Sequence, residues 1–234
     1  VAHAETIAAF TKAVIYSISD SAGNALAAAG TAYNEAVDIT ITGNLTFAKA
    51  EIIKEAGNSG TKTYVINDTA TIIAGAVGAT SGSIADVDTL SSATSVTANT
   101  SATFAEAVTI AGTATVISYS ISDEQSNIPG STTGALNEAI NIVITNNVTF
   151  AQAKIIDDAS NSGSNTYNIS DTAQNISNGI IASVAAVSGA GTVTSSTEAT
   201  GPQSVIIASI SKTIAYSISD TAANIVANIG GLNE

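Results

Sequence analysis

Short runs in which large apolar residues alternate with small polar residues recur along the chain. The clearest is YSISD, which begins at Tyr16, Tyr119 and Tyr216, with the variants YVIND at Tyr64 and YNISD at Tyr167. Alternation with a period of two is typical of a β-strand that has one buried face. We therefore expect the tyrosines and the apolar residues that follow them to point inward, and the serines to point outward.

Further strand-like phrases lie between the tyrosine phrases: ITIT at 39–42, SVTA at 95–98, IVIT at 142–145 and VTSS at 193–196. Taken together, strands are predicted to begin near residues 16, 39, 64, 95, 119, 142, 167, 193 and 216. Successive starts are separated by 23 to 31 residues. A longer period overlies this one, because residues 41–70 reappear as residues 144–173, at an offset of 103 without a gap. Such self-similarity indicates a repeat protein.

A short helix is predicted after each strand. In TFAQAKII, which starts at Thr149, the residues Phe150, Ala153 and Ile156 recur at helical spacing. An Asp or Asn before such a run is typical of a helix N-cap. Gly-Asn-Ser stretches at 56–60 and 159–163 are expected to end the helices.

One strand and one helix in about 25 residues predict an α/β fold. We expect a right-handed solenoid of about nine coils with one parallel sheet, on the general plan of leucine-rich repeats; an all-β solenoid is the alternative. Residues 1–234 are expected to form one continuous array. The widest gap between strands contains TSGSIADVDTLSS, from Thr80 to Ser92, which we interpret as a loop insertion. Val1 aligns with Phe104 and Glu234 with Glu138, so both termini fall inside a repeat, and we expect a longer array or end-to-end stacking.

Composition excludes several classes of protein. The chain is 45% hydrophobic, which suffices for a core, but it has only four Phe, six Tyr and no Trp, so the core is built mainly from small residues. Without Cys there is neither a disulfide nor a thiolate metal site. A net charge of −13 with six scattered Lys is unsuited to nucleic acid. The sequence contains no apolar run long enough to span a membrane, and residues 1–10 lack a basic signal-peptide region, so an export signal is expected outside this segment.

The phrases YSISDTAANI, at 216–225, and TFAQAKII, at 149–156, resemble the Ala/Thr/Ser/Asn-rich repeat arrays of large bacterial surface proteins and adhesins. The resemblance extends over the whole chain. It concerns the style of the repeat and carries no catalytic motif. It implies export, an extracellular or cell-surface location and a scaffolding or adhesive role.

One acidic or amide residue follows most of the predicted strands. These residues are Asp20, Asn44, Asp68, Asn99, Asp123, Asn147, Asp171 and Asp220. In stacked coils they would form a ladder with a spacing of about 4.8 Å. We interpret them as helix caps and turn-holding side chains, and the alternation of amides with carboxylates as a means to limit charge repulsion.

The same ladder could in principle bind calcium, because aligned carboxylates attract a hard cation. The calcium-binding nonapeptide repeat is absent, so we expect no cofactor, with Ca²⁺ as the open alternative at the insertion or at a coil junction. Other acidic spots are expected to be solvated surface charges. They are Asp86 and Asp88, the pair Asp157 and Asp158, and the recurring Asn-Glu pairs at 34–35, 137–138 and 233–234.

No enzyme is expected. His3 is the only histidine and aligns with Glu106, Lys49 and Gln152, a mixture typical of a solvent-facing site. A Ser-His-Asp set elsewhere is therefore impossible, and no single carboxylate pair stands out from its counterparts in other coils.

The sequence thus predicts a structural segment of a filament, surface layer, sheath or adhesin stalk that associates along the solenoid axis with copies of itself or adjacent repeats. A module that binds a glycan or a cell surface through the sheet face is the alternative, and a polysaccharide-degrading enzyme is a third.

Overall fold

The computed structural model describes residues 2–9, 14–25, 30–78 and 84–228, and these form an α/β structure with two five-stranded parallel sheets. The α/β class predicted from the sequence is confirmed, and the all-β alternative is wrong. The chain divides into two units, residues 1–102 with 106–119, and residues 103–105 with 120–234. In each unit the strands follow one another across the sheet in chain order.

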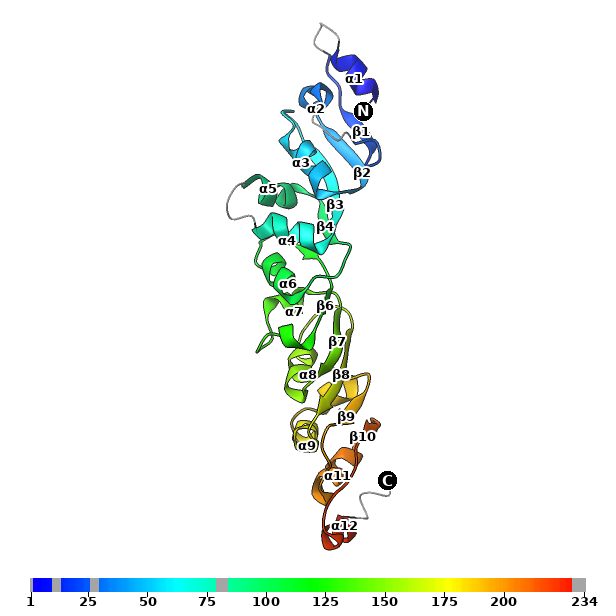
Figure 1. Cartoon of the computed structure of the whole chain (residues 1–234). Coiled ribbons are helices and arrows are strands. Elements are labelled where there is room, and N and C mark those ends of the chain that lie inside the picture. Colours follow the sequence, from blue (N-terminus) through cyan, green and yellow to red (C-terminus); the bar gives the residue numbers. More distant parts are fainter. Residues whose placement is uncertain (1, 10–13, 26–29, 79–83, 229–234) are drawn as a thin grey trace. The chain divides into compact units, whose positions relative to one another are not determined.

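The first unit contains five strands in the order β1-β2-β3-β4-β5. They are β1 (Ile18–Ser21), β2 (Ile39–Leu45), β3 (Lys62–Asp68), β4 (Ser95–Ala98) and β5 (Ile117–Ser118). The helices of this unit lie along one side of its sheet (Figure 1). They are α1 (Ala2–Ala8), α2 (Thr31–Glu35), α3 (Phe47–Glu55), α4 (Ala70–Gly78), α5 (Ile84–Ser92) and the greater part of α6 (Phe104–Ala111).

The second unit repeats this plan with the order β10-β9-β8-β7-β6. Its strands are β6 (Ile121–Asp123), β7 (Ile142–Val148), β8 (Asn165–Asp171), β9 (Val193–Ser195) and β10 (Ile214–Ala215). After β6 comes a single 3₁₀ turn, η1 (Gln125–Asn127). The α-helices are α7 (Gly134–Glu138), α8 (Phe150–Asp157), α9 (Ala173–Ala182), α10 (Val184–Gly189), α11 (Gly201–Ala208) and α12 (Ala222–Asn228).

Side-chain alternation places one row of each strand in the core. Tyr64, Tyr119 and Tyr167 are at most 1% exposed, as the sequence predicts, whereas Tyr16 and Tyr216 are half-buried. The phenol groups reach across to the helical layer. Tyr64 Oη donates to the carbonyl oxygen of Thr89 at 3.0 Å, and Tyr167 Oη donates to that of Ala186 at 2.9 Å. Because these hydroxyls are bonded, the ring can be buried without leaving a polar atom unsatisfied. Burial also raises the pKa of Tyr64 to about 12.

The predicted strand starts at 39, 95, 142 and 193 coincide with β2, β4, β7 and β9, and the others lie within two residues of a strand. The single continuous sheet is not observed. The phrase from Ile117 to Asp123 is divided, because its first part pairs with β4 and its last part with β7, while Tyr119 and Ser120 belong to neither strand.

The predicted insertion at 80–92 is helical in its described part, where a loop was expected. Residues 80–83 lie outside the described residues, but Ile84–Ser92 is the helix α5, which packs against α3 and α4. Thr89 and Leu90 are fully buried in this contact layer. The apolar residues of the insertion therefore extend the helical layer.

The turns that lead into β3 and β8 are fixed by side chains from the preceding repeat. Asp38 Oδ1 accepts hydrogen bonds from the backbone N and the Oγ1 of Thr61, at 2.8 and 2.7 Å. Asn141 Oδ1 does the same with Ser164, at 2.9 and 3.1 Å. A glycine precedes each hydroxyl residue because the acceptor side chain and the backbone behind it occupy the space a Cβ would need.

We predict that Gly163→Ala destabilises the second unit by about 1–3 kcal/mol, because the new Cβ would lie 2.4 Å from Asn141 Oδ1 and 2.5 Å from the carbonyl oxygen of Ile140. Gly130→Ala is the matched control, since no atom lies within 4 Å of its Cβ position. Urea unfolding followed by circular dichroism measures both free energies. Equal stability of the two variants would contradict the turn geometry.

Candidate functional site: the ladder between neighbouring repeats

Carboxylates at strand ends bind the first helical amide of the preceding repeat. The acceptor is Oδ2 in each case. The pairs are Asp68 with Phe47 N (2.9 Å), Asp123 with Phe104 N (2.8 Å), Asp171 with Phe150 N (2.9 Å) and Asp220 with Gly201 N (2.9 Å). The first amides of a helix have no partner within the helix, and a negative charge there is favoured by the helix dipole. Each bond therefore closes one repeat with a side chain from the next.

The second carboxylate oxygen holds the turn of its own repeat. Oδ1 of Asp171 accepts from Thr172 N and from Asn175 Nδ2, both at 2.8 Å. The same pair of bonds recurs at three other ladder positions, where the amide side chain again lies four residues after the Asp. These are Asp20 with Asn24, Asp123 with Asn127 and Asp220 with Asn224. A ladder Asp thus bridges two repeats with a single side chain.

The predicted N-caps are wrong, because threonines occupy those positions. Thr46, Thr149, Thr172 and Thr200 are the N-cap residues of α3, α8, α9 and α11. Thr149 forms a capping box with Gln152, and Thr172 Oγ1 accepts from Asn175 N at 3.2 Å. With the cap filled by Thr, the Asp side chain is available to reach the preceding repeat.

The amides of the predicted ladder have different positions. Asn44 and Asn147 are exposed on β2 and β7, each beyond a register shift in its strand. Asn99 Nδ2 donates to Asn67 Oδ1 at 2.8 Å. At the neighbouring rungs a hydroxyl replaces the carboxylate, since Thr100 Oγ1 accepts from Ala70 N and Thr197 Oγ1 from Ala173 N, both at 3.0 Å.

This arrangement explains the alternation of acids and amides differently from charge repulsion. Asp68, Asp123, Asp171 and Asp220 stand where the preceding repeat presents a helix N-terminus. In sequence, α2 and α7 begin closer to the strands that follow them, β2 and β7, than α3 and α8 begin to β3 and β8. At these four positions a carboxylate therefore faces a helix N-terminus, whereas the hydroxyls of Thr100 and Thr197 serve α4 and α9 in the same way.

Hydrogen bonds favour the ionised form of Asp220 and Asp123. The bond from Gly201 N, followed by those from Asn224 and Thr221, lowers the pKa of Asp220. For Asp123, burial opposes ionisation, but the bonds from Phe104, Asn127 and Glu124 outweigh it and lower the pKa. A depressed folded-state pKa stabilises the fold above the ordinary value of 3.8. That stability is lost as the pH falls through the lowered value.

A second row of links involves the third residue of the helices. Lys49 Nζ donates to the carbonyl oxygen of Ala22 at 3.0 Å, and Gln152 Nε2 donates to that of Gln125 at 3.1 Å. Glu106 Oε1 accepts from Thr71 Oγ1 at 2.7 Å. The site that aligns with His3 is therefore not simply solvent-facing. Its variability arises because Lys, Gln and Glu can each bond a polar atom of the preceding repeat.

In two of the Asn-Glu pairs that were predicted to be solvated, the Asn forms a hydrogen bond to the next repeat. Asn34 Oδ1 accepts from Gly57 N at 2.8 Å, and Asn137 Oδ1 accepts from Ser160 N at 3.0 Å. The pair at 233–234 lies outside the described residues. The side chains of Asn34 and Asn137 thus fix the loop that follows the helix in the next repeat. This role was hard to recognise from the sequence, because short polar side chains are also common on solvated surfaces.

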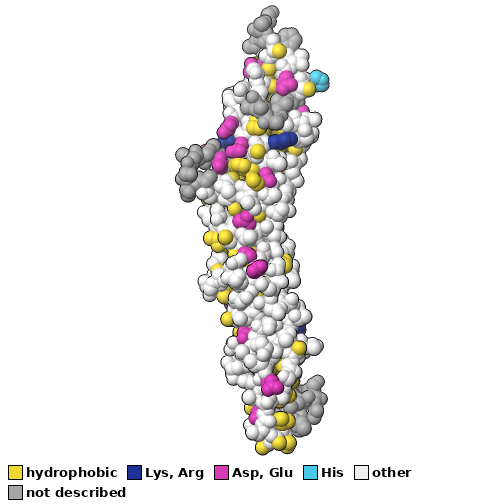
Figure 2. Space-filling view, viewed as in Figure 1, with side chains coloured by type: hydrophobic (Ala, Val, Ile, Leu, Met, Phe, Trp, Pro, Cys, Tyr) yellow, Lys and Arg dark blue, Asp and Glu magenta, His cyan; other side chains and the backbone are white. Residues whose placement is uncertain are grey.

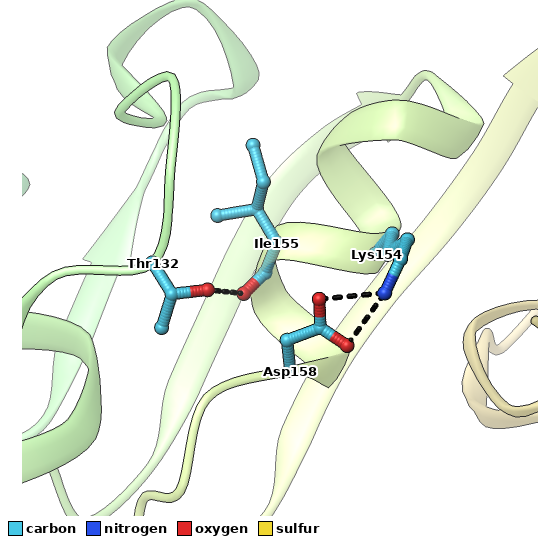
Figure 3. A network of polar contacts seen from close by, with 4 residues as sticks. All are labelled: Thr132, Lys154, Ile155 and Asp158. Atoms are coloured by element: carbon cyan, nitrogen blue, oxygen red, sulfur yellow. Dashed lines mark hydrogen bonds and ion pairs between the residues drawn. The ribbon is translucent and has the colours of Figure 1, made fainter.

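Helix α8 makes one polar contact with the preceding repeat and another within its own C-terminal end. Thr132 Oγ1, from the preceding repeat, donates to the carbonyl oxygen of Ile155 at 3.3 Å (Figure 3). Lys154 Nζ binds both oxygens of Asp158, at 2.8 and 2.7 Å, within the helix end. Beside this pair, burial and the charge of Asp158 raise the pKa of Asp157. The exposed ion pair contributes little to stability, in contrast to the links between repeats.

A groove of about 460 Å³ lies beside Phe150 and Gly179. Its polar lining is committed to structural bonds, since Asp171 accepts three of them and Asn178 Oδ1 accepts from Gln174 Nε2 at 2.8 Å. Within the part of the chain that the structure describes, no three acidic or histidine side chains gather closely enough to hold a metal ion. The ladder carboxylates already face N–H donors, which are unfavourable neighbours for a cation.

No helix among the described residues is both long and apolar enough to cross a bilayer. The chain matches no protein-family model, no curated protein and no solved structure.

We predict that Asp171→Ala destabilises the second unit by about 2 kcal/mol, because it leaves the amides of Phe150 and Thr172 without their charged acceptor. Glu198→Ala, an exposed acid in the same unit, should change stability by less than about 0.5 kcal/mol. The comparison is made by urea unfolding at neutral pH. If both variants unfold like the wild type, the ladder does not stabilise the fold.

Proposed function

We propose that this chain is a structural repeat segment, a right-handed solenoid of about nine coils, in a bacterial extracellular or cell-surface protein such as a filament, surface layer, sheath or adhesin stalk. The observation that supports this most strongly is the ladder. Because the N-termini of six helices, namely α3, α4, α6, α8, α9 and α11, are closed by a side chain from the next repeat, these repeats are complete only beside their neighbours. Stability that depends on neighbouring repeats is the physical basis of solenoids.

The solenoid geometry is supported within each unit separately. Strand order follows chain order, every pair is parallel, and helices connect successive strands. Parallel connections of this kind are right-handed in almost all proteins. The offset of 103 residues, which relates the register shifts of β2 and β7, supports one repeating plan for both units.

Association along the solenoid axis is supported by the unpaired edge of β1, which is an edge strand of the sheet of the first unit. In a parallel ladder alternate amides point to each side, and since Ile18 N donates to Asp38 O, the N–H of Ser19 points away from β2. Such an edge is a template for another strand, from further repeats or another copy. A contact of this kind does not close on itself and so produces filaments. We propose that Ca²⁺ aids this contact by neutralising part of the −13 charge between neighbours.

Electron microscopy and light scattering of the purified chain test this function. We predict axial association that increases with protein concentration and with added Ca²⁺. Ser19→Pro should reduce it, because proline removes the outward N–H while leaving the β1–β2 bonds in place. A protein that stays monomeric at high concentration, with or without Ca²⁺, would contradict axial assembly.

A further inference from the structure

The outer face of each sheet is lined by small uncharged side chains. In the second unit, Ser122, Val143 and Thr166 are neighbours in register, as are Ser170, Thr194 and Ala215. In the first unit the corresponding rows are Ser19, Thr40 and Thr63, and Asn67, Thr97 and Ser118. We call these two surfaces the sheet faces. Most of their side chains are exposed or half-buried.

Charge is excluded from the sheet faces. No outward position of the described strands carries Asp, Glu or Lys, although the chain has 19 acidic residues and a net charge of −13. Strand carboxylates such as Asp68 and Asp171 lie on the inner row, bonded to helices. The other described acids lie on helices, turns and loops, and acidic side chains are scattered over the largely neutral view in Figure 2. The sheet faces are thus the surfaces where two copies could approach with least repulsion.

The chemistry of the sheet faces favours a copy of the chain over a carbohydrate. Sugar rings are commonly held by exposed aromatic faces, but Tyr64, Tyr119 and Tyr167 are on the inner row and buried. Hydroxyl groups both donate and accept hydrogen bonds, so a surface of Ser and Thr is complementary to itself. Small side chains also permit sheets to stack about 10 Å apart.

We infer that the sheet faces are lateral interfaces, through which two copies of this chain pack face to face. This goes beyond the proposed axial association and uses a different surface. Because repulsion between the negative molecules opposes the contact, salt should strengthen it by screening that repulsion.

Sedimentation velocity of the Ser19→Pro variant, in which axial association is reduced and the sheet face of the second unit is unchanged, tests the proposal at low and high sodium chloride. We expect reversible dimers that become more abundant at high salt. The double variant Thr166→Glu/Thr194→Glu should weaken dimers about tenfold or more, because it places like charges opposite one another. The control Ala185→Glu/Ser188→Glu adds the same charge to exposed positions of α10 and should weaken them far less. Far-UV circular dichroism verifies that each variant is folded.

A disulfide test gives the same information without the Ser19→Pro substitution. Because the chain has no Cys, a single Thr166→Cys should form covalent dimers under mild oxidation, whereas Ala185→Cys should not. Monomers under all conditions, or equal cross-linking of both cysteines, would overturn the proposal. Binding to insoluble chitin or cellulose that Thr166→Glu/Thr194→Glu abolishes, without any dimer, would also overturn it and assign the face to a polysaccharide. If the wild-type protein forms no axial filaments, the proposed axial assembly is refuted, and the test of the lateral interface is unaffected.

Discussion

The backbone amides in the first turn of the short helices, which have no acceptor within the helix, are the constraint on which the rest of this structure depends. Helices of eight to ten residues, such as α8 and α9, gain little stability by themselves, and their first amides have no internal acceptor. Here the acceptor comes from the strand end of the following repeat, as a carboxylate at Asp68 or Asp171 and as a hydroxyl at Thr100. Local helix stability and the stacking of repeats thereby become one interaction.

Other features of the repeat follow from this link. The N-cap must be filled locally, and threonine does so, which leaves the Asp side chain free to reach backwards. The loop after each helix must approach the preceding strand closely, so Gly60 and Gly163 occupy positions where a Cβ would collide. Tyrosines then bridge sheet and helices, since a ring that carries a hydroxyl can bury its surface and bond a backbone carbonyl in the opposite layer.

The strands and the main helices could be predicted from the sequence because they depend on local periodicity. Alternation placed Tyr64 and Tyr167 in the core, and helical spacing located α8. The direction of the ladder could not be predicted in this way. An Asp before a helix has the same local pattern whether it caps its own helix or binds an amide 21 residues earlier, as Asp171 does with Phe150. Similarly, the linking roles of Asn34 and Lys49 depend on distances between repeats, which a single sequence does not display.

Amide hydrogen exchange at the helix N-termini tests the central claim most directly. First-turn amides normally exchange rapidly, because nothing within the helix protects them. If the ladder exists, the amides of Phe47, Phe104, Phe150 and Gly201 are protected to an extent similar to amides in the middle of their helices, and Asp171→Ala removes the protection at Phe150 alone. Rapid exchange at all four amides in the wild-type protein would contradict the account.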